Sequence, residues 1–329
     1  MPMQHPSAQA DAQSGQPRTP VICLLGPTAS GKTALAVELV RRLPFDIINV
    51  DSAQIYRDMD IGTGKPDAAT LALAPHRLLG FLDPAQVYSA SRFRADALRE
   101  MEVIRAQGRI PLLVGGTMLY FKALRDGLAT MPGADPQIRE QITATAAAHG
   151  WAAVHAQLQV VDPASARRIH PNDPQRLQRA LEIFLVSGKS MTQWHQESHA
   201  LRAPSFDPFD LHFLSIQPRS RSVLHHKIAA RFRNMLERGL VAEVEALRSR
   251  GDLTLAMPSM RAVGYRQVWQ YIAGELAFDA MLEQGIIATR QLAKRQMTWL
   301  RSWENLQNFD SENPETLELI LKFVDRIAL

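Results

Sequence analysis

The feature that most constrains this chain is an eight-residue loop between an apolar run and a helix pattern. Residues 26–33 read GPTASGKT and match the G-x-x-x-x-G-K-[ST] phosphate loop. Residues 21–25 are continuously apolar, as in a buried parallel strand, and a helix pattern follows over 32–43. The alternative is a glycine-rich turn without a ligand. Because strand, loop and helix occur together, we predict a site where loop N–H groups and the helix N-terminus bind a diphosphate or triphosphate.

The rest of the chain predicts an α/β fold that is interrupted once. Apolar runs at 45–50 and 110–114 alternate with a helix pattern at 89–106, as in a parallel sheet with crossover helices. A helical, proline-containing stretch follows, and an apolar run at 211–216 then returns to the sheet. We predict a P-loop parallel sheet flanked by helices, divided into a disordered tail (1–20), a P-loop core with C-terminal helices (21–125 and 209–329) and a helical insertion domain (126–208).

Composition excludes several classes of protein. Of 329 residues, 46% are hydrophobic and 21% are charged, which is typical of a globular chain and not of a disordered, collagen-like or coiled-coil one. No apolar run approaches the length of about 20 residues that a membrane helix needs, and residues 1–20 lack the apolar core of a secretory signal. The single cysteine, Cys23, is typical of a reducing compartment, so we expect a cytoplasmic protein. A net charge of +4 permits a polyanionic partner.

Asp51 ends the second apolar run, at the edge where ligands of open α/β sheets bind. Its carboxylate can hold Mg²⁺, act as a general base, or cap the following turn. Ser52 and Gln54 follow closely and can hydrogen-bond near the same site. The third apolar run ends in GGT at 115–117 and has no acid, whereas a motor ATPase normally needs a carboxylate there for its metal and water. This absence favours group transfer over hydrolysis.

Basic residues gather in the second half of the chain, which we expect to be mostly helical from about residue 221 to Trp303. Residues 284–303 hold four cations and no acid, interleaved with tryptophans, which suits a nucleic acid through phosphate contact and base stacking. The alternative places the tryptophans in the core and the cations in water. For the basic helix pattern at 175–179, a solvated face is the simpler interpretation. Arg221 follows the last apolar run, where it can reach a phosphate or remain a surface residue.

Together these segments resemble the bacterial tRNA dimethylallyltransferases, also called tRNA isopentenyltransferases. The resemblance rests on seven segments in the family's order: GPTASGKT at 26–33, DSAQIYRDMDIGT at 51–63, PHRL at 75–78, LVGGTMLYFKAL at 113–124, HPNDPQRLQRALE at 170–182, RAVGYRQ at 261–267 and TRQLAKRQMTWLR at 289–301. The first is shared with many phosphate-loop proteins, and the last four are far more specific. They span most of the chain after the tail, which has no family counterpart.

The resemblance implies transfer of a dimethylallyl group from dimethylallyl diphosphate to N6 of adenosine 37 in tRNA, with Mg²⁺ as cofactor. It implies Asp51 as general base, Lys32 and Thr33 as diphosphate and Mg²⁺ contacts, and Arg221 as an arginine that steadies the diphosphate. The implied diphosphate-binding residues are Gly26, Pro27, Thr28, Ala29, Ser30, Gly31, Lys32 and Thr33. The implied contacts to the tRNA anticodon stem-loop are Asp51, Ser52, Ala53, Gln54, Thr117, Arg139, Gln175, Arg176, Leu177, Gln178, Arg179, Arg261, Ala262, Val263, Gly264, Tyr265, Arg266, Lys294, Arg295, Gln296, Met297, Thr298, Trp299, Leu300 and Arg301. We expect a monomer that binds no membrane.

Two positions depart from the family pattern. Lys227 stands where arginine is usual, and Gln54 stands where an apolar residue is common, so the roles of these two side chains stay open. From the residues alone, two other classes of protein also stay open. One is a P-loop kinase in which the insertion is an arginine-bearing lid, and the other is a non-catalytic, nucleotide-regulated RNA binder.

Overall fold

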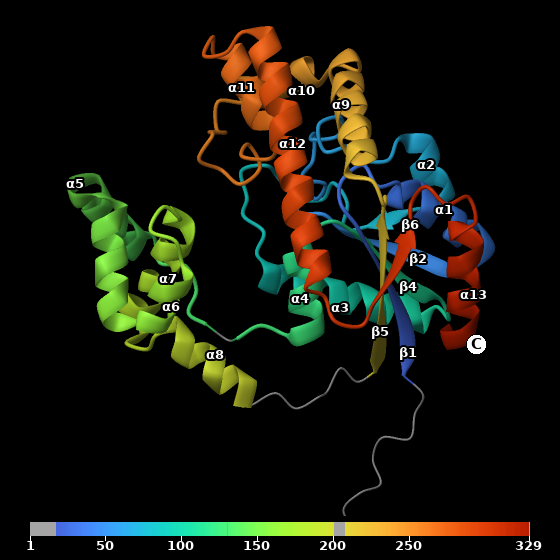
Figure 1. The fold of residues 1–329 in the computed structure, drawn as a ribbon, viewed down its shortest axis with the longest axis horizontal. Coiled ribbons are helices and arrows are strands. Elements are labelled where there is room, and N and C mark those ends of the chain that lie inside the picture. The colour runs from blue at the N-terminus through green and yellow to red at the C-terminus, as the bar shows by residue number, and fades with distance from the viewer. Residues whose placement is uncertain (1–17, 130, 201–207, 329) are drawn as a thin grey trace, which may run out of the picture. The chain divides into compact units, whose positions relative to one another are not determined.

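Short apolar runs become the strands of a parallel sheet. The computed structural model describes residues 18–129, 131–200 and 208–328, so residues 1–17 of the predicted tail lie outside the described part (Figure 1). The strands are β1 (Thr19–Leu25), β2 (Phe45–Val50), β3 (His76–Arg77), β4 (Ile110–Gly115), β5 (Phe209–Gln217) and β6 (Leu306–Asp310). They form a six-stranded sheet in the order β3-β2-β4-β1-β5-β6, in which every pairing is parallel. The predicted parallel α/β fold is confirmed.

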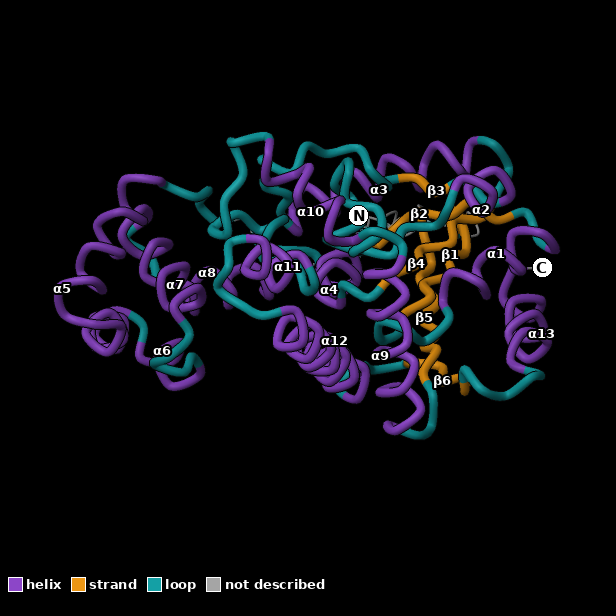
Figure 2. The backbone as a smooth tube through the Cα atoms, turned by 90° about the horizontal axis from the view of Figure 1, so that it is seen from above, coloured by secondary structure: helices purple, strands orange, loops and turns teal. Residues whose placement is uncertain are grey.

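Helices cover both faces of this sheet, which explains why residues 21–25 of β1 and 110–114 of β4 are apolar without interruption. Val21, Cys23 and Leu25 of β1 enter one core cluster, and Ile22 and Leu24 enter the other. The helices of this unit are α1 (Lys32–Arg42), α2 (Ala68–Leu73), α3 (Ala90–Ala106), α4 (Met118–Asp126), α9 (Arg221–Glu237), α10 (Leu240–Ser249), α11 (Tyr265–Ile272), α12 (Phe278–Arg301) and α13 (Thr316–Ala328). Figure 2 shows α1 and α13 on one face of the sheet and α4 and α12 on the other.

The C-terminal prediction was incomplete. Helix α12 ends at Arg301, near the expected limit, but the chain then adds strand β6 and helix α13. Strand β6 pairs with β5 at the sheet edge. It is only five residues long and includes Leu306 and Asn308. An edge strand this short and polar has little apolar alternation of its own, so pairing with β5 decides its conformation. Ile320 and Val324 of α13 complete the core cluster on the α1 face.

Residues Gly127–Ser205 form a separate compact unit of helices, and Met1–Asp126 with Phe206–Leu329 form the other unit. The helices are α5 (Pro136–Val161), α6 (Pro163–Arg168), α7 (Pro174–Ser187) and α8 (Met191–Ala200). Three of them begin with the same device, an aspartate N-cap followed by proline: Asp135, Asp162 and Asp173 each accept a hydrogen bond from a backbone N–H of the first turn. Gly150, with φ 77°, kinks α5, so Ile142 and Leu158 reach one shared core with Leu177.

No helix among the described residues combines the length and the apolar character needed to cross a bilayer.

Candidate functional site

The phosphate loop connects the end of β1 to the first residue of α1, as predicted. A Cβ at Gly26 would lie 2.4 Å from the carbonyl oxygen of Ile216 in β5, so only glycine fits where the loop leaves the sheet. The Lys32 side chain folds back over the loop, and its Nζ donates hydrogen bonds to the carbonyl oxygens of Gly26 at 3.0 Å and Pro27 at 2.6 Å. Two carbonyl oxygens of the loop therefore hold the Lys32 ammonium against the loop.

The loop borders a cavity of about 370 Å³. The cavity is lined by residues 28–34 of the loop and α1, by Asp51, Ala53 and Gln54 after β2, and by side chains of α9, the 262–265 segment and α12. Asp51 Oδ1 accepts hydrogen bonds from the N–H groups of Ala53 at 2.9 Å and Gln54 at 3.4 Å. The Asp51 carboxylate thus caps its own turn and also faces the cavity, so the capping role is compatible with a role in binding or catalysis.

Two cations and one carboxylate share this cavity. Burial lowers the pKa of Lys32 to about 8, the nearby Asp51 carboxylate opposes that shift, and the Arg231 guanidinium adds to it. Burial likewise lowers the pKa of Arg231, and Asp51 again opposes the shift. Arg231 comes from α9, and its Nη2 donates to the carbonyl oxygen of Thr63 at 3.5 Å. The sequence analysis missed Arg231, because no local motif distinguishes it from the other arginines of α9.

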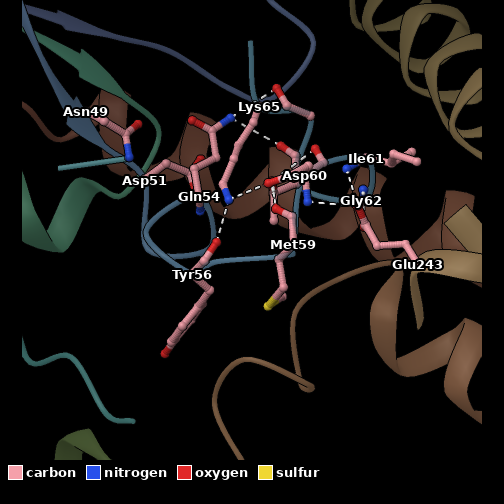
Figure 3. Close-up of polar contacts among 12 residues, drawn as sticks. Asn49, Asp51, Gln54, Tyr56, Met59, Asp60, Ile61, Gly62, Lys65 and Glu243 are labelled. Carbon is pink, nitrogen blue, oxygen red and sulfur yellow. Dashed lines mark hydrogen bonds and ion pairs between the residues drawn. The ribbon is translucent and has the colours of Figure 1, made fainter. Parts of the chain in front are cut away.

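The loop over residues 54–65, whose polar contacts Figure 3 shows, contributes Gln54, Gly62 and Thr63 to the lining of the cavity. Gln54 Nε2 donates to the carbonyl oxygens of Thr63 and Gly64, both at 3.2 Å, so the side chain that departs from the family pattern closes the loop. Lys65 Nζ donates to the Tyr56 carbonyl oxygen at 2.5 Å and to Asp60 Oδ1 at 2.6 Å. These internal contacts hold Gly62 and Thr63 in place as cavity lining.

Glu243 of α10 anchors this loop from outside. Its Oε2 accepts the N–H groups of Asp60 at 2.9 Å and Ile61 at 2.7 Å, and its Oε1 accepts the N–H of Gly62 at 3.0 Å (Figure 3). The Tyr265 hydroxyl also donates to Oε1, at 2.5 Å. Burial, together with the Glu243 carboxylate, raises the pKa of Tyr265. One carboxylate therefore joins two walls of the cavity, and the sequence analysis did not single it out.

Gln296 joins the long helix α12 to the phosphate loop. Its Oε1 accepts the N–H of Thr28 at 2.9 Å, and its Nε2 donates to the carbonyl oxygen of Gly116 at 2.9 Å. Next to Gly116, Thr117 Oγ1 accepts the N–H of Ser52 at 2.9 Å, which ties the end of β4 to the residue after Asp51. The structure therefore brings together the loop, the Asp51 turn and the Gly-Gly turn that the sequence analysis named separately.

Several predicted tRNA contacts need correction, because their side chains are buried in the protein. Leu177 and Tyr265 are fully buried, Leu300 is 3% exposed and Gln296 is 7% exposed. Leu177 packs in the insertion core, Leu300 and Tyr265 pack in the main core, and Gln296 is engaged as described above. Leu177 and Leu300 therefore support the scaffold and offer no surface to an RNA, whereas Tyr265 and Gln296 reach only the lining of the cavity.

The other predicted contact residues on α12 and the neighbouring Trp303 differ in their exposure to solvent. Lys294, Arg295, Thr298, Trp299 and Arg301 are exposed, whereas Trp303 after the helix is 7% exposed. Trp303 lies against the Phe213 ring, and the Arg125 guanidinium stacks over its indole at 4.5 Å from the ring centroid. The alternative that places the tryptophans in the core is therefore correct for Trp303 and wrong for Trp299, which is exposed beside the cations.

Arg221 lies at the first position of α9, is exposed, and is not among the residues that line the cavity. Burial lowers the pKa of His225, one turn along α9, and the charges of Arg290, Arg221 and His226 lower it further. The Arg290 Nε is buried and has no hydrogen-bond partner among the described residues. Arg221 therefore belongs to a basic group between α9 and α12, beside the cavity that holds Lys32.

In the insertion unit, two predicted tRNA contacts share a buried acid. Arg139 Nε and Arg179 Nη1 each donate to Glu182, both at 2.7 Å, and Glu182 is fully buried. Burial alone would raise the pKa of Glu182, but the two guanidinium groups lower it overall. Gln178 Nε2 donates to the Arg139 carbonyl oxygen and to Thr143, and Gln175 and Arg176 are exposed. Arg139 and Arg179 thus have a structural role in this unit, whatever else they contact.

Among the 261–266 residues, Arg261 and Arg266 are exposed, while Ala262 and Val263 line the cavity with Tyr265. The segment enters α11 at Tyr265. A phosphate loop that opens onto a cavity with one carboxylate, two cations and an apolar wall defines the class as a P-loop α/β transferase. The end of β4 carries glycines in place of the carboxylate of a motor ATPase.

Comparison with known proteins identifies the family. The family described as "IPP transferase" matches residues 54–303, and the family described as "Isopentenyl transferase" matches residues 19–79. The full-length tRNA isopentenylpyrophosphate transferase from Bacillus halodurans is 32% identical, over 94% of this chain and 97% of that one, with a TM-score of 0.68. The chain belongs to the tRNA isopentenyltransferase family, whose enzymes are tRNA dimethylallyltransferases.

Two further solved structures agree with this assignment. The tRNA delta(2)-isopentenylpyrophosphate transferase from Staphylococcus epidermidis is 29% identical, over 94% of this chain and 99% of that one, with a TM-score of 0.67. A eukaryotic dimethylallyltransferase acting on tRNA is 25% identical, over 94% of this chain and 76% of that one, with a TM-score of 0.73.

Proposed function

We propose that this enzyme transfers a dimethylallyl group from dimethylallyl diphosphate to N6 of adenosine 37 in tRNAs, releasing diphosphate. The observation that carries the proposal is the cavity itself, where Lys32 and the phosphate loop meet Asp51 and an apolar wall. The loop suits the diphosphate, the apolar side chains suit the prenyl group, and the carboxylate suits the acceptor amine.

The leaving group needs strong stabilisation, because an exocyclic adenine amine is a poor nucleophile whose lone pair is delocalised into the ring. As the C–O bond of the donor breaks, negative charge develops on the diphosphate oxygens. The loop and Lys32 line the cavity, and the proposal adds Arg221, which is exposed at the start of α9, as a further cation for the diphosphate. Preorganised donors of this kind lower the barrier without reorganisation. Lys32 contributes this charge only when it is protonated.

Asp51 acts as the general base in this proposal. Its Oδ1 is engaged by two backbone N–H groups, which fixes the orientation of the carboxylate. No hydrogen bond among the described residues engages the other oxygen, Oδ2, and in this proposal Oδ2 accepts the N6 proton as the new C–N bond forms. Lys32 and Arg231 share the cavity with this carboxylate.

Mg²⁺ fits the residues present. Hard cations prefer oxygen ligands, and Mg²⁺ usually binds one or two protein oxygens together with substrate phosphates. Thr33 and Asp51 line the cavity and provide such oxygens, and the described residues contain no cluster of three or more acidic, histidine or cysteine side chains that would hold a metal alone. Thr33 is the residue we assign to the ion, which neutralises charge on the diphosphate when bound.

For the tRNA, we propose contacts from the exposed face of α12, including Lys294, Arg295 and Trp299, and from Arg261 and Arg266. An adenine must leave its stack to reach Asp51, which costs least in a single-stranded anticodon loop. From the insertion unit we propose Gln175 and Arg176, the most exposed of its predicted residues.

The test is mass spectrometry of tRNA nucleosides after incubation with dimethylallyl diphosphate and Mg²⁺. We expect N6-dimethylallyladenosine at position 37 and release of diphosphate that requires both substrates. ATP consumption without a change in the tRNA would instead support a kinase. Light scattering of the purified protein checks the expected monomer.

A further inference from the structure

One helix, α9, runs from the phosphate loop to the apolar part of the cavity. Near the loop, Leu224 and Ile228 of α9 pack with Ala29 of the loop and Ala293 of α12. Phe232, one turn further along α9, lines the same cavity. Because a helix rises 1.5 Å per residue, Phe232 lies about 6 Å further along the axis than Ile228. A chain attached to a diphosphate in the loop therefore meets Ile228 first and Phe232 next.

The Phe232 ring spans the space between α9 and α12. A Cβ at Gly285 of α12 would lie 2.2 Å from Phe232 Cζ, so the tip of the ring rests directly on the α12 backbone. A Cβ at Gly264 would lie 3.4 Å from Cε2 of the same ring, so that side is also in contact. Phe232 is only 3% exposed. Because close-packed neighbours hold it on two sides, the ring cannot move away from the cavity.

Building on the transfer reaction proposed above, we propose that Phe232 sets the length of prenyl chain that the donor site accepts. A dimethylallyl group is about the size of a leucine side chain, and in this proposal it lies between Ile228 and the ring, which both line the cavity. A ten-carbon geranyl chain has to pass the position of the ring. An apolar pocket discriminates weakly against a missing methylene, but a wall that cannot move excludes a longer chain sterically.

The test compares two donors, dimethylallyl diphosphate and geranyl diphosphate, in the full-length enzyme with saturating tRNA. The variants are Phe232→Ala and the milder Phe232→Leu. The matched control is Phe93→Leu, because Phe93 of α3 is equally buried, at 1% exposed, and stacks on Tyr120 outside the cavity lining. The measured quantity is the ratio of kcat/KM for geranyl over kcat/KM for dimethylallyl. A loss of folded enzyme lowers both values equally and leaves this ratio unchanged.

We expect the ratio to rise at least about tenfold in Phe232→Ala, by less in Phe232→Leu, and not at all in Phe93→Leu. A ratio in both Phe232 variants equal to that of the control overturns the proposal for Phe232, even when the wild type transfers dimethylallyl normally. A wild type that transfers neither group to tRNA overturns the proposed function instead, so the two failures are distinguishable.

Discussion

Replacing Glu243 with glutamine tests how the loop at 54–65 is held in place. Glu243 Oε2 accepts two backbone N–H groups, and Oε1 accepts the Gly62 N–H and the Tyr265 hydroxyl. A glutamine amide has one oxygen and an NH₂ group that only donates. Its best orientation places the oxygen at Oε2 and the NH₂ at Oε1, where Tyr265 can turn its hydroxyl and accept. The Gly62 N–H then has no acceptor.

The expected loss of unfolding free energy follows from the number of hydrogen bonds that the substitution removes or weakens. A buried donor left without a partner costs about 1–3 kcal/mol, and hydrogen bonds to a charged acceptor are about twice as strong as neutral ones. In Glu243→Gln, the Gly62 N–H loses its acceptor, and the hydrogen bonds from the Asp60 and Ile61 N–H groups weaken because the acceptor is no longer charged. Together these changes amount to a destabilisation of about 3 kcal/mol. Glu245→Gln is the control, because Glu245 is exposed on the same helix and should change stability by less than about 0.5 kcal/mol.

Urea unfolding of the two variants and the wild type measures the difference. In addition, the Michaelis constant for the donor should rise in Glu243→Gln, because Gly62, Thr63 and Tyr265 all line the cavity. If Glu243→Gln loses no more stability than Glu245→Gln, the four hydrogen bonds do not anchor the loop in solution and the reasoning is refuted.

Three other predictions concern the reaction and the tRNA. In steady-state kinetics at saturating substrates, Asp51→Asn should lower turnover by about 10²–10⁴-fold and retain donor affinity. A loss of turnover below tenfold would show that Asp51 is not the general base. Recovery of turnover at high Mg²⁺ would indicate that Asp51 is a metal ligand instead. Donor affinity, measured by calorimetry, should weaken as the pH rises through about 8, because Lys32 loses its proton there, and a constant affinity from pH 7 to 9 would argue against this cation. In tRNA-binding titrations, Lys294→Ala and Arg295→Ala should each reduce the log–log salt slope by about 0.7 to 0.9; unchanged slopes mean that both cations are only solvated.

Local patterns were sufficient for the phosphate loop and for the four inner strands of the sheet, β2, β4, β1 and β5. The runs at 21–25 and 110–114 are apolar at every position, and such runs indicate strands buried on both faces without information from elsewhere in the chain. Strand β6 was missed for the opposite reason, since its five residues become a strand only by pairing with β5.

The residues of the site likewise divide into those that local sequence predicts and those that only long-range packing brings in. Asp51 was recognisable from its place after a strand, but Arg231 and Glu243 lie more than 150 residues further along the chain, and no local pattern distinguishes them. Gln296 shows how a basic helix can mislead, because its neighbours Arg295 and Lys294 are exposed while it turns inward to the Thr28 N–H.

The phosphate loop, the parallel strands around it and the basic character of α12 are predictable from local sequence, because each depends on residues close together in the chain. The tertiary structure alone decided which helix faces meet to form the cavity, that Glu243 receives three N–H groups of one loop, and that the Phe232 ring rests on Gly285. The physical reason is that periodicity specifies which side of an element is buried, whereas packing against distant elements decides what that side contacts.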